Sequence, residues 1–350
     1  MFTALNQIAA AAIAVAIVAV TSLSGGIGAQ VGGAMIGNRT VVVISLRTPG
    51  GPPSRCSNAA LSSMYFTDAR SVSAYFAENS YGAMSVSGAV TGPYEIRLEP
   101  GWTPTSVADA ADAAATAARV NLSLYSQKVY VLPKEADPTP IQSAWGGRGG
   151  RSRLWIRDYW CSSKWLVAHE LGHNFGVNHA STPADEYGDF SSSMGGRLDH
   201  ADPSMWNNMP HFNAPGKIAA GWLPVSAVQA VINGGSFRVA SVETVPAPGQ
   251  IQALKIKAEG EGTDHYYISY RQPLGFSAAL TPQYVGTTSV TRWNGANGAK
   301  TCLLANLADG QAFADASGFM VAQRSHDASH ALVTVTFGTG PLSSARVPCP

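Results

Sequence analysis

The run of residues 169–179, His-Glu-Leu-Gly-His-Asn-Phe-Gly-Val-Asn-His, limits what this chain can fold into more than any other segment. His169 and His173 are four residues apart, so on an α-helix their side chains lie on the same face. Gly176 can take the left-handed conformation that ends a helix and turns the chain sharply. That turn lets His179 return to the same point. The sequence therefore predicts a helix that ends near this glycine and presents three imidazoles to one place.

Three imidazoles beside a carboxylate are the groups of a catalytic zinc site. Zinc binds imidazole nitrogens at about 2.0–2.1 Å, and three protein ligands leave a fourth position open. Glu170 follows the first histidine and lies roughly 100° further round the helix, so it can reach a bound water without binding the metal. Zinc lowers the pKa of its water to about 7 and polarises a carbonyl. We therefore predict that Glu170 takes the water's proton and delivers it to the leaving nitrogen of a cleaved amide.

The spacing HExxHxxGxxH resembles the metzincin clan of zinc peptidases, in which a methionine-containing turn follows the motif. Met194, within residues 191–195, is the candidate for that turn. The resemblance implies that it forms an apolar floor beneath the three imidazoles. Some metzincins carry a tyrosine two residues after this methionine, where it assists the transition state. Gly196 occupies that position here, so no such role is predicted.

Finer features resemble one family of this clan, the gametolysin-type (M11) peptidases, which are secreted enzymes known from green algae that act on cell-wall glycoproteins. The similar segments lie between about residues 40 and 345, at 80–82, 168–174, 186–189, 193–195, 212–215, 221–223 and 266–271. The resemblance implies a secreted zinc endopeptidase that acts on extracellular or cell-wall proteins. A sheet edge above its cleft would bind the peptide substrate as an added strand.

The first two thirds of the chain alternates short strand-like and helix-like runs. Strands are predicted at 40–46, 85–90 and 128–132, with an edge strand at 154–156, and helices at 71–79, 105–124, 164–177 and 217–222. Thr105 and Ser106 begin the second helix, and Asp109 completes what resembles a capping box. We therefore predict an α/β zinc-peptidase domain at 31–223, with a twisted mixed sheet and the metal-binding helix below the cleft.

The residue pattern changes beyond Pro224. Short strand-like runs separated by turn residues lie at 237–242, 252–257, 265–270, 287–292, 319–323 and 331–337. Several short strands at such spacing indicate an all-β sandwich or barrel. We therefore predict a β-sandwich-like domain at 224–350.

The N-terminal residues and the charge balance indicate where the protein works. An uncharged apolar run, Ile8–Val20, is followed by small residues up to Ala29. This pattern predicts a signal peptide at 1–29, with an uncleaved anchor as the alternative; the run is shorter than the roughly 20 residues that span a bilayer. Lys+Arg number 23 and Asp+Glu number 22, a balance that gives no electrostatic footprint for nucleic acid or for an anionic membrane. We expect a secreted monomer without stable membrane insertion.

The four cysteines, Cys56, Cys161, Cys302 and Cys349, indicate two disulfides in a secreted chain, with three possible connectivities. Pairing within each part of the chain, the first two together and the last two together, is the simplest arrangement. Cys56 faintly resembles the propeptide cysteine that keeps some metzincins latent. Its place inside the predicted catalytic domain favours a disulfide instead.

An acidic cluster follows the histidine motif. Its members are Asp185, Glu186, Asp189, Asp199 and Asp202. Hard oxygen ligands of this kind could hold calcium, although no known calcium-loop spacing is present, and a solvated loop is the alternative.

Two other function classes stay open. One is a secreted binding or adhesion protein in which the zinc site is only structural. The other is a zinc hydrolase that acts on a non-peptide amide. The intact Glu170 argues against the first, because a structural site does not need it.

Overall fold

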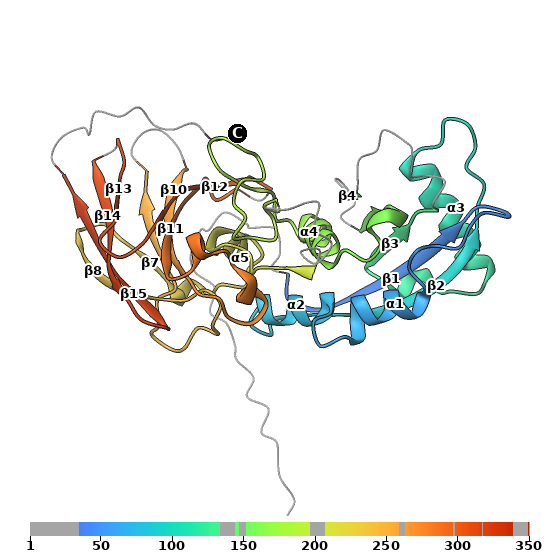
Figure 1. Ribbon diagram of the computed structural model, residues 1–350, viewed down its shortest axis with the longest axis horizontal. Coiled ribbons are helices and arrows are strands. Elements are labelled where there is room, and N and C mark those ends of the chain that lie inside the picture. Colours follow the sequence, from blue (N-terminus) through green and yellow to red (C-terminus); the bar gives the residue numbers. More distant parts are fainter. Residues whose placement is uncertain are drawn as a thin grey trace, which may run out of the picture. The chain divides into compact units, whose positions relative to one another are not determined.

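The computed structural model of this chain describes residues 35–133, 144–146, 152–196, 207–258, 263–296, 298–316, 318–338 and 349. The predicted signal peptide at 1–29 and the predicted mature N-terminus near Gln30 lie outside these ranges. Val31–Pro350 forms one compact unit, in which the described residues contribute few helices and three sheets (Figure 1). The architecture is therefore mixed α/β. No described helix is long and apolar enough to cross a membrane.

The first sheet has the strand order β2-β1-β3-β5-β4. Its strands are β1 (Gly37–Arg47), β2 (Met84–Glu95), β3 (Gln127–Val131), β4 (Ala144–Gly146) and β5 (Arg153–Ile156). Neighbouring strands are parallel except β4, which runs antiparallel to β5. The predicted strand at 154–156 is present, but the prediction that it forms the edge is wrong, because β4 pairs outside it.

Apolar side chains cover both faces of this sheet. Val41 and Val43 pack into the core that contains α2 (Val72–Asn79) and α4 (Lys164–Asn174). Val42 and Ile44 pack on the opposite face, in the core that contains α3 (Pro104–Ala117). A continuous β-branched run suits such a strand, because a parallel sheet covered on both sides has no solvent-facing positions.

The boundaries of α3 differ from the prediction for physical reasons. The helix begins at Pro104, whose fixed φ suits the first helical position. Thr103 and Ser106 cap it reciprocally. The predicted partner Asp109 instead forms an ion pair with Arg153 at 3.0 Å. The helix ends at Ala117, because Arg119 takes a positive φ of 66°.

Apart from 3₁₀ segments, three short helices remain among the described residues. They are α1 (Asn58–Ser62), the π-helical turn Ser63–Thr67 that follows it, and α5 (Ala214–Ala219). The helix predicted at 217–222 is thus displaced toward the N-terminus, because Asn213 caps α5 and Pro215 lies in its first turn.

Two further sheets contain the strands predicted beyond Pro224, together with strands that the sequence pattern missed. The six-stranded sheet has the order β6-β12-β11-β10-β9-β7 and the four-stranded sheet has the order β13-β14-β15-β8. Their strands are β6 (Ala180–Ser181), β7 (Val228–Ala230), β8 (Gly235–Ala240), β9 (Ala253–Lys257), β10 (His265–Arg271), β11 (Thr287–Trp293), β12 (Thr301–Leu307), β13 (Ala312–Ala314), β14 (Phe319–His326) and β15 (His330–Phe337).

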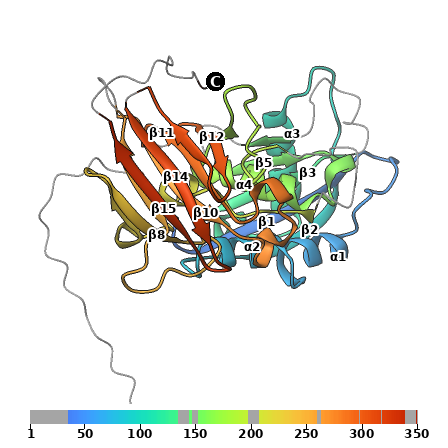
Figure 2. The ribbon, with the colours of Figure 1, turned by 60° about the vertical axis from the view of Figure 1, so that its left-hand side comes forward.

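The two sheets pack against each other (Figure 2). Leu254, Ile268 and Val290 of the six-stranded sheet share one buried cluster with Val321 and Val333 of the four-stranded sheet. Strand β6 comes from the region predicted to be the catalytic domain, yet it pairs with β12 in the six-stranded sheet. The domain division at 223/224 therefore stays a prediction.

The disulfides have the simplest predicted pairing. Cys56 is bonded to Cys161 and Cys302 to Cys349, so no cysteine is free. Cys56 therefore carries no thiol for the latency role considered above.

Replacement of Cys56 and Cys161 together by serine should lower the free energy of unfolding by about 2–5 kcal/mol, because that bond closes a long loop in the unfolded chain. Chemical unfolding of the two proteins measures the difference. The same change at Cys302 and Cys349 is the matched control, since the two loops span 105 and 47 residues of sequence. Loss of the disulfide that closes the longer loop should lower the free energy of unfolding more. The opposite ranking would contradict this entropic account.

Candidate metal site

Helix α4 carries two of the three motif histidines on one face. It begins after Ser163, whose side chain accepts a hydrogen bond from the Leu166 amide at 3.3 Å. After the helix, Gly176 has a φ of +88°, and Val177 N donates to Gly172 O at 3.0 Å. These are the features of a glycine-terminated helix, and they turn the chain back as the spacing predicted.

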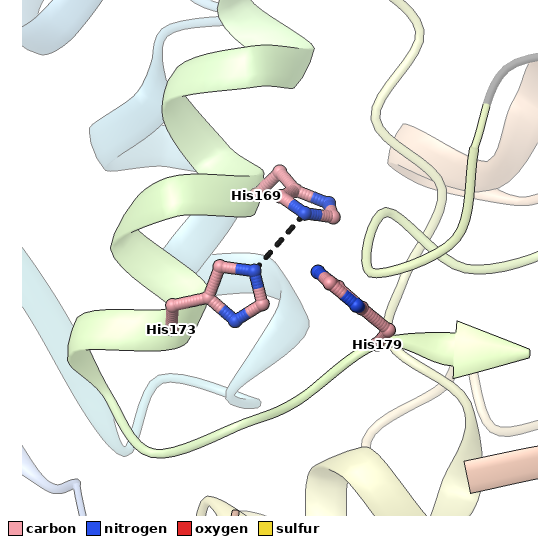
Figure 3. A group of neighbouring side chains, drawn as sticks. All are labelled: His169, His173 and His179. Carbon is pink, nitrogen blue, oxygen red and sulfur yellow. Dashed lines mark hydrogen bonds between the residues drawn. The ribbon is translucent and has the colours of Figure 1, made fainter. Parts of the chain in front are cut away.

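The three histidines meet at one place (Figure 3). One possible ligand nitrogen from each of His169, His173 and His179 lies within 4.8 Å of the other two. The two Nε2 atoms of His169 and His173 are 3.1 Å apart. The ring of His179 completes the group, with centroids 5.4 and 4.7 Å from those of His169 and His173. The structure therefore brings together the three residues that the sequence analysis proposed as ligands.

Backbone carbonyls orient the two helical imidazoles. His169 Nδ1 donates to Ser193 O at 2.9 Å, and His173 Nδ1 donates to Val177 O at 3.0 Å. A carbonyl oxygen only accepts hydrogen bonds, so Nδ1 carries a proton in each ring, and in the neutral form that binds metal ions Nε2 carries the lone pair. Both lone pairs then point into the cluster.

A carboxylate orients the third imidazole. His179 Nδ1 donates to Glu186 Oε1 at 2.7 Å, and Lys300 Nζ lies 3.0 Å from the same oxygen. Hydrogen bonds from Lys300, and then from His179, hold the pKa of Glu186 below its usual value. The carboxylate is therefore charged at neutral pH, and its hydrogen bond leaves Nε2 of His179 as the nitrogen available to a metal ion.

This donor set fits a metal ion. Two Nε2 lone pairs that face each other at 3.1 Å cannot hydrogen-bond to one another while both protons reside on Nδ1. They repel unless a cation lies between them. Metal–nitrogen distances of 2.0–2.1 Å at a tetrahedral angle would put two ligand nitrogens about 3.3–3.4 Å apart, close to the distance observed. The three-histidine cluster could therefore hold a metal ion.

The protonation state of His169 suits the same role. Burial lowers its pKa well below the usual value, and the neighbouring His173 and His179 lower it further. The imidazole is therefore neutral at physiological pH, and the neutral form is the one that binds metal ions.

Glu170 lies next to His169 on α4 and is 6% exposed. Its carboxylate is not a member of the group of possible ligand atoms that the three histidines form. The helix therefore carries a buried acid next to the first histidine of the cluster, and the role of Glu170 stays a prediction.

Met194 packs directly against the helical turn that carries the histidines. Its side chain is buried, and a Cβ added at Gly172 would collide with its sulfur and lie 3.0 Å from Phe212 Cζ. Gly172 falls between His169 and His173, so its lack of a side chain is what lets the methionine approach. Met194 O also accepts a hydrogen bond from Ala180 N at 2.9 Å, which ties this turn to the residue after the third histidine.

Tyr187 is a neighbour of the cluster that sequence reasoning could not place. Its ring centroid lies 4.2 Å from that of His179 and 6.1 Å from that of His169, and the residue is 40% exposed. Gly196 N donates to Tyr187 O at 2.5 Å, and a Cβ at Gly196 would lie 3.2 Å from Tyr187 Cβ. Tyr187 therefore fills space beside Gly196, the residue two positions after Met194.

Arg271, which the sequence analysis did not single out, supports the methionine turn from the six-stranded sheet. The residue lies at the end of β10 with its side chain fully buried. Its Nε forms an ion pair with Glu243 Oε1 at 2.7 Å, and its Nη2 donates to Ser191 O at 2.7 Å. Ser191 is two residues before Ser193, whose carbonyl orients His169.

The calcium prediction gains no support from the described residues. Asp199 and Asp202 lie outside them. Asp189 is buried, and its two oxygens accept hydrogen bonds from the side chains of Ser191 and Asn213. Within the described ranges, the three histidines are the one group of three or more His, Cys, Asp or Glu side chains that could hold a metal ion.

Replacement of Gly172 by alanine should destabilise the protein by about 1–3 kcal/mol through overpacking against Met194. The sign of the stability change is diagnostic, because glycine-to-alanine replacement in an unhindered helix stabilises a protein by about 1 kcal/mol. Denaturant unfolding of the metal-free protein measures it. In a Met194→Ala background the cost should shrink, and stabilisation by Gly172→Ala in the wild-type background would contradict the contact.

Two comparisons with known proteins bear on the family of this chain. Comparison with curated proteins gave no match. The family model of gametolysin peptidase M11 matches residues 40–307, a range that includes the three histidines, Glu170 and Met194 and extends into the six-stranded sheet. M11 is a family of metallopeptidases, and its match covers most of the chain. The protein therefore belongs to the gametolysin peptidase M11 family.

Proposed function

We propose that this protein is a secreted zinc-dependent endopeptidase that hydrolyses peptide bonds of extracellular or cell-wall proteins, and that its first part has a metzincin-like fold. One observation carries the proposal. Three imidazoles use Nδ1 for hydrogen bonds to the protein and gather their possible ligand nitrogens within 4.8 Å of one another, beside a buried glutamate on the same helix. The family match supports peptidase chemistry at that point.

Zinc is the metal that this ligand set favours. Imidazole nitrogen is a common zinc ligand, and three protein ligands with an open position are typical of catalytic rather than structural zinc. His169, His173 and His179 would hold one ion. When bound there, zinc would supply a Lewis acid that polarises the substrate carbonyl and lowers the pKa of water.

Glu170 would be the general base and then the general acid. Its carboxylate accepts the proton of the attacking water and returns it to the leaving amide nitrogen, so the peptide bond breaks with balanced proton transfer. Burial beside His169 suits this role, because it keeps competing water away from the carboxylate. Met194 and Gly176 would support the site, the first by packing against Gly172 and the second by turning His179 back.

The substrate would bind as an extended strand along β4. This strand is the outermost strand of the first sheet at the end that lies against α4, and it runs antiparallel to its neighbour. The outward backbone groups of an edge strand can pair with a peptide, while side-chain pockets select the residues. Such binding lays the scissile bond across the helix that carries Glu170.

Secretion is consistent with the covalent structure. Both disulfides join distant parts of the chain, and disulfides persist mainly in oxidising compartments. The signal peptide at 1–29 stays part of the proposal.

Cleavage of casein by the mature chain from about Gln30 tests the proposed activity. A zinc chelator should abolish cleavage, and added zinc should restore it. Glu170→Gln should lower kcat by about 10²–10⁴-fold, because it removes the general base. Zinc content measured on the same samples should be unchanged, since Glu170 lies outside the ligand set.

The controls separate the alternatives. His169→Ala should lose both zinc and cleavage, unlike Glu170→Gln. Full casein cleavage by Glu170→Gln with zinc bound would refute the proposed mechanism. Cleavage of small non-peptide amides without any cleavage of casein would support the non-peptide hydrolase instead.

A further inference from the structure

His179 differs from the other two histidines in the group that holds its ring. His169 and His173 donate to neutral backbone carbonyls, whereas His179 donates to the carboxylate of Glu186 at 2.7 Å. A hydrogen bond to a charged acceptor is roughly twice as strong as a neutral one. A carboxylate on Nδ1 also raises the basicity of Nε2, which makes the imidazole a stronger metal ligand.

His179 also needs such a partner more than the other two. His169 and His173 are held by the backbone of α4, but His179 follows Gly176 and lies outside the helix. Its carbonyl accepts a hydrogen bond from Thr301 N at 3.0 Å, which fixes its backbone. Its hydrogen bond to Glu186 fixes the rotation of its ring.

The surroundings of Glu186 present its carboxylate to His179. The neighbouring turn is closed by Thr182 N, which donates to Asp185 O at 2.8 Å, and by Tyr187 N, which donates to Asp185 Oδ1 at 2.9 Å. On the other side, Lys300 Nζ lies 3.0 Å from Glu186 Oε1. Lys300 directly precedes β12, so the six-stranded sheet holds the carboxylate that orients the ligand.

We propose that Glu186 is a positioning residue for the metal site, which turns Nε2 of His179 toward the other two imidazoles and strengthens it as a ligand, while Lys300 holds the carboxylate in place. This inference rests on the proposed metal-binding function. Glu186 does not touch the reacting atoms. Its side chain is 41% exposed, so its ion pairs contribute little to folding. Its loss should therefore weaken metal binding without unfolding the protein.

The test is the Zn²⁺ affinity of the metal-free mature chain, measured by competition with a chromophoric chelator. Glu186→Ala should weaken zinc binding about 10–100-fold, the usual effect of losing such a partner. Glu186→Gln should recover part of this loss, because its amide oxygen still accepts from Nδ1 but carries no charge. The melting temperature of each metal-free variant should match that of the wild type.

Glu95→Gln is the matched control. Glu95 also forms an exposed ion pair, with Arg47 at 2.7 Å, and its side chain is 49% exposed. This variant should bind zinc as the wild type does. The visible spectrum of the Co²⁺-loaded proteins supplies a second readout, because it reports ligand geometry: it should change in Glu186→Ala and not in Glu95→Gln.

The outcomes separate this inference from the proposed function. Zinc affinity of Glu186→Ala within twofold of the wild type, or an equal loss in Glu95→Gln, would overturn the inference and leave the zinc site standing. Failure of the wild type to bind zinc would overturn both. If Glu186→Ala does not fold, Glu186→Gln decides: wild-type affinity and an unchanged Co²⁺ spectrum in a folded Gln variant would show that the charge contributes nothing, contrary to the inference.

Discussion

The hydrogen bonds that leave the three imidazole Nδ1 atoms are the constraint on which the rest of the site depends. Ser193 O and Val177 O accept two of them, and Glu186 accepts the third. Each bond fixes a tautomer and a ring rotation at once, so three Nε2 lone pairs face a single point. Lone pairs held this close repel each other unless a cation lies between them. A bound cation would remove this repulsion, so the fold holds the three imidazoles in an arrangement that suits a metal ion.

The β-rich part of the chain beyond Pro224 contributes to that geometry at several points. Arg271 of β10 holds the carbonyl of Ser191 in the methionine turn, and Lys300 holds Glu186. Thr301 N donates to His179 O, and the next two residues of the chain, Ala180 and Ser181, pair with β12. The three proposed metal ligands all come from residues 169–179, but residues beyond 270 contribute to their orientation. The family match also includes these residues, since it extends to residue 307 at the end of β12.

Sequence alone predicted the parts of this structure that depend on local rules. Helical periodicity and one glycine were enough to bring His169, His173 and His179 together, and β-branched runs identified most strands. Contacts formed by tertiary packing had no local signal: nothing in the pattern links Lys300 to Glu186, Arg271 to Ser191, or Tyr187 to the histidine rings. Strand β12 was missed because its sequence, Thr-Cys-Leu-Leu-Ala-Asn-Leu, has a single β-branched residue. The predicted start of α3 at Thr105 was wrong because Thr103 caps the helix and Pro104 takes its first position.

X-ray absorption at the zinc edge of the zinc-loaded mature chain tests the central claim most directly, because it counts and identifies the atoms around the metal. Convergence of three Nε2 lone pairs predicts scattering from three imidazoles, with nitrogen at about 2.0–2.1 Å. One oxygen ligand should complete the shell, and no cysteine sulfur should be present, since all four cysteines are in disulfides. Fewer than three imidazoles, or a sulfur ligand at about 2.3 Å, would contradict the account.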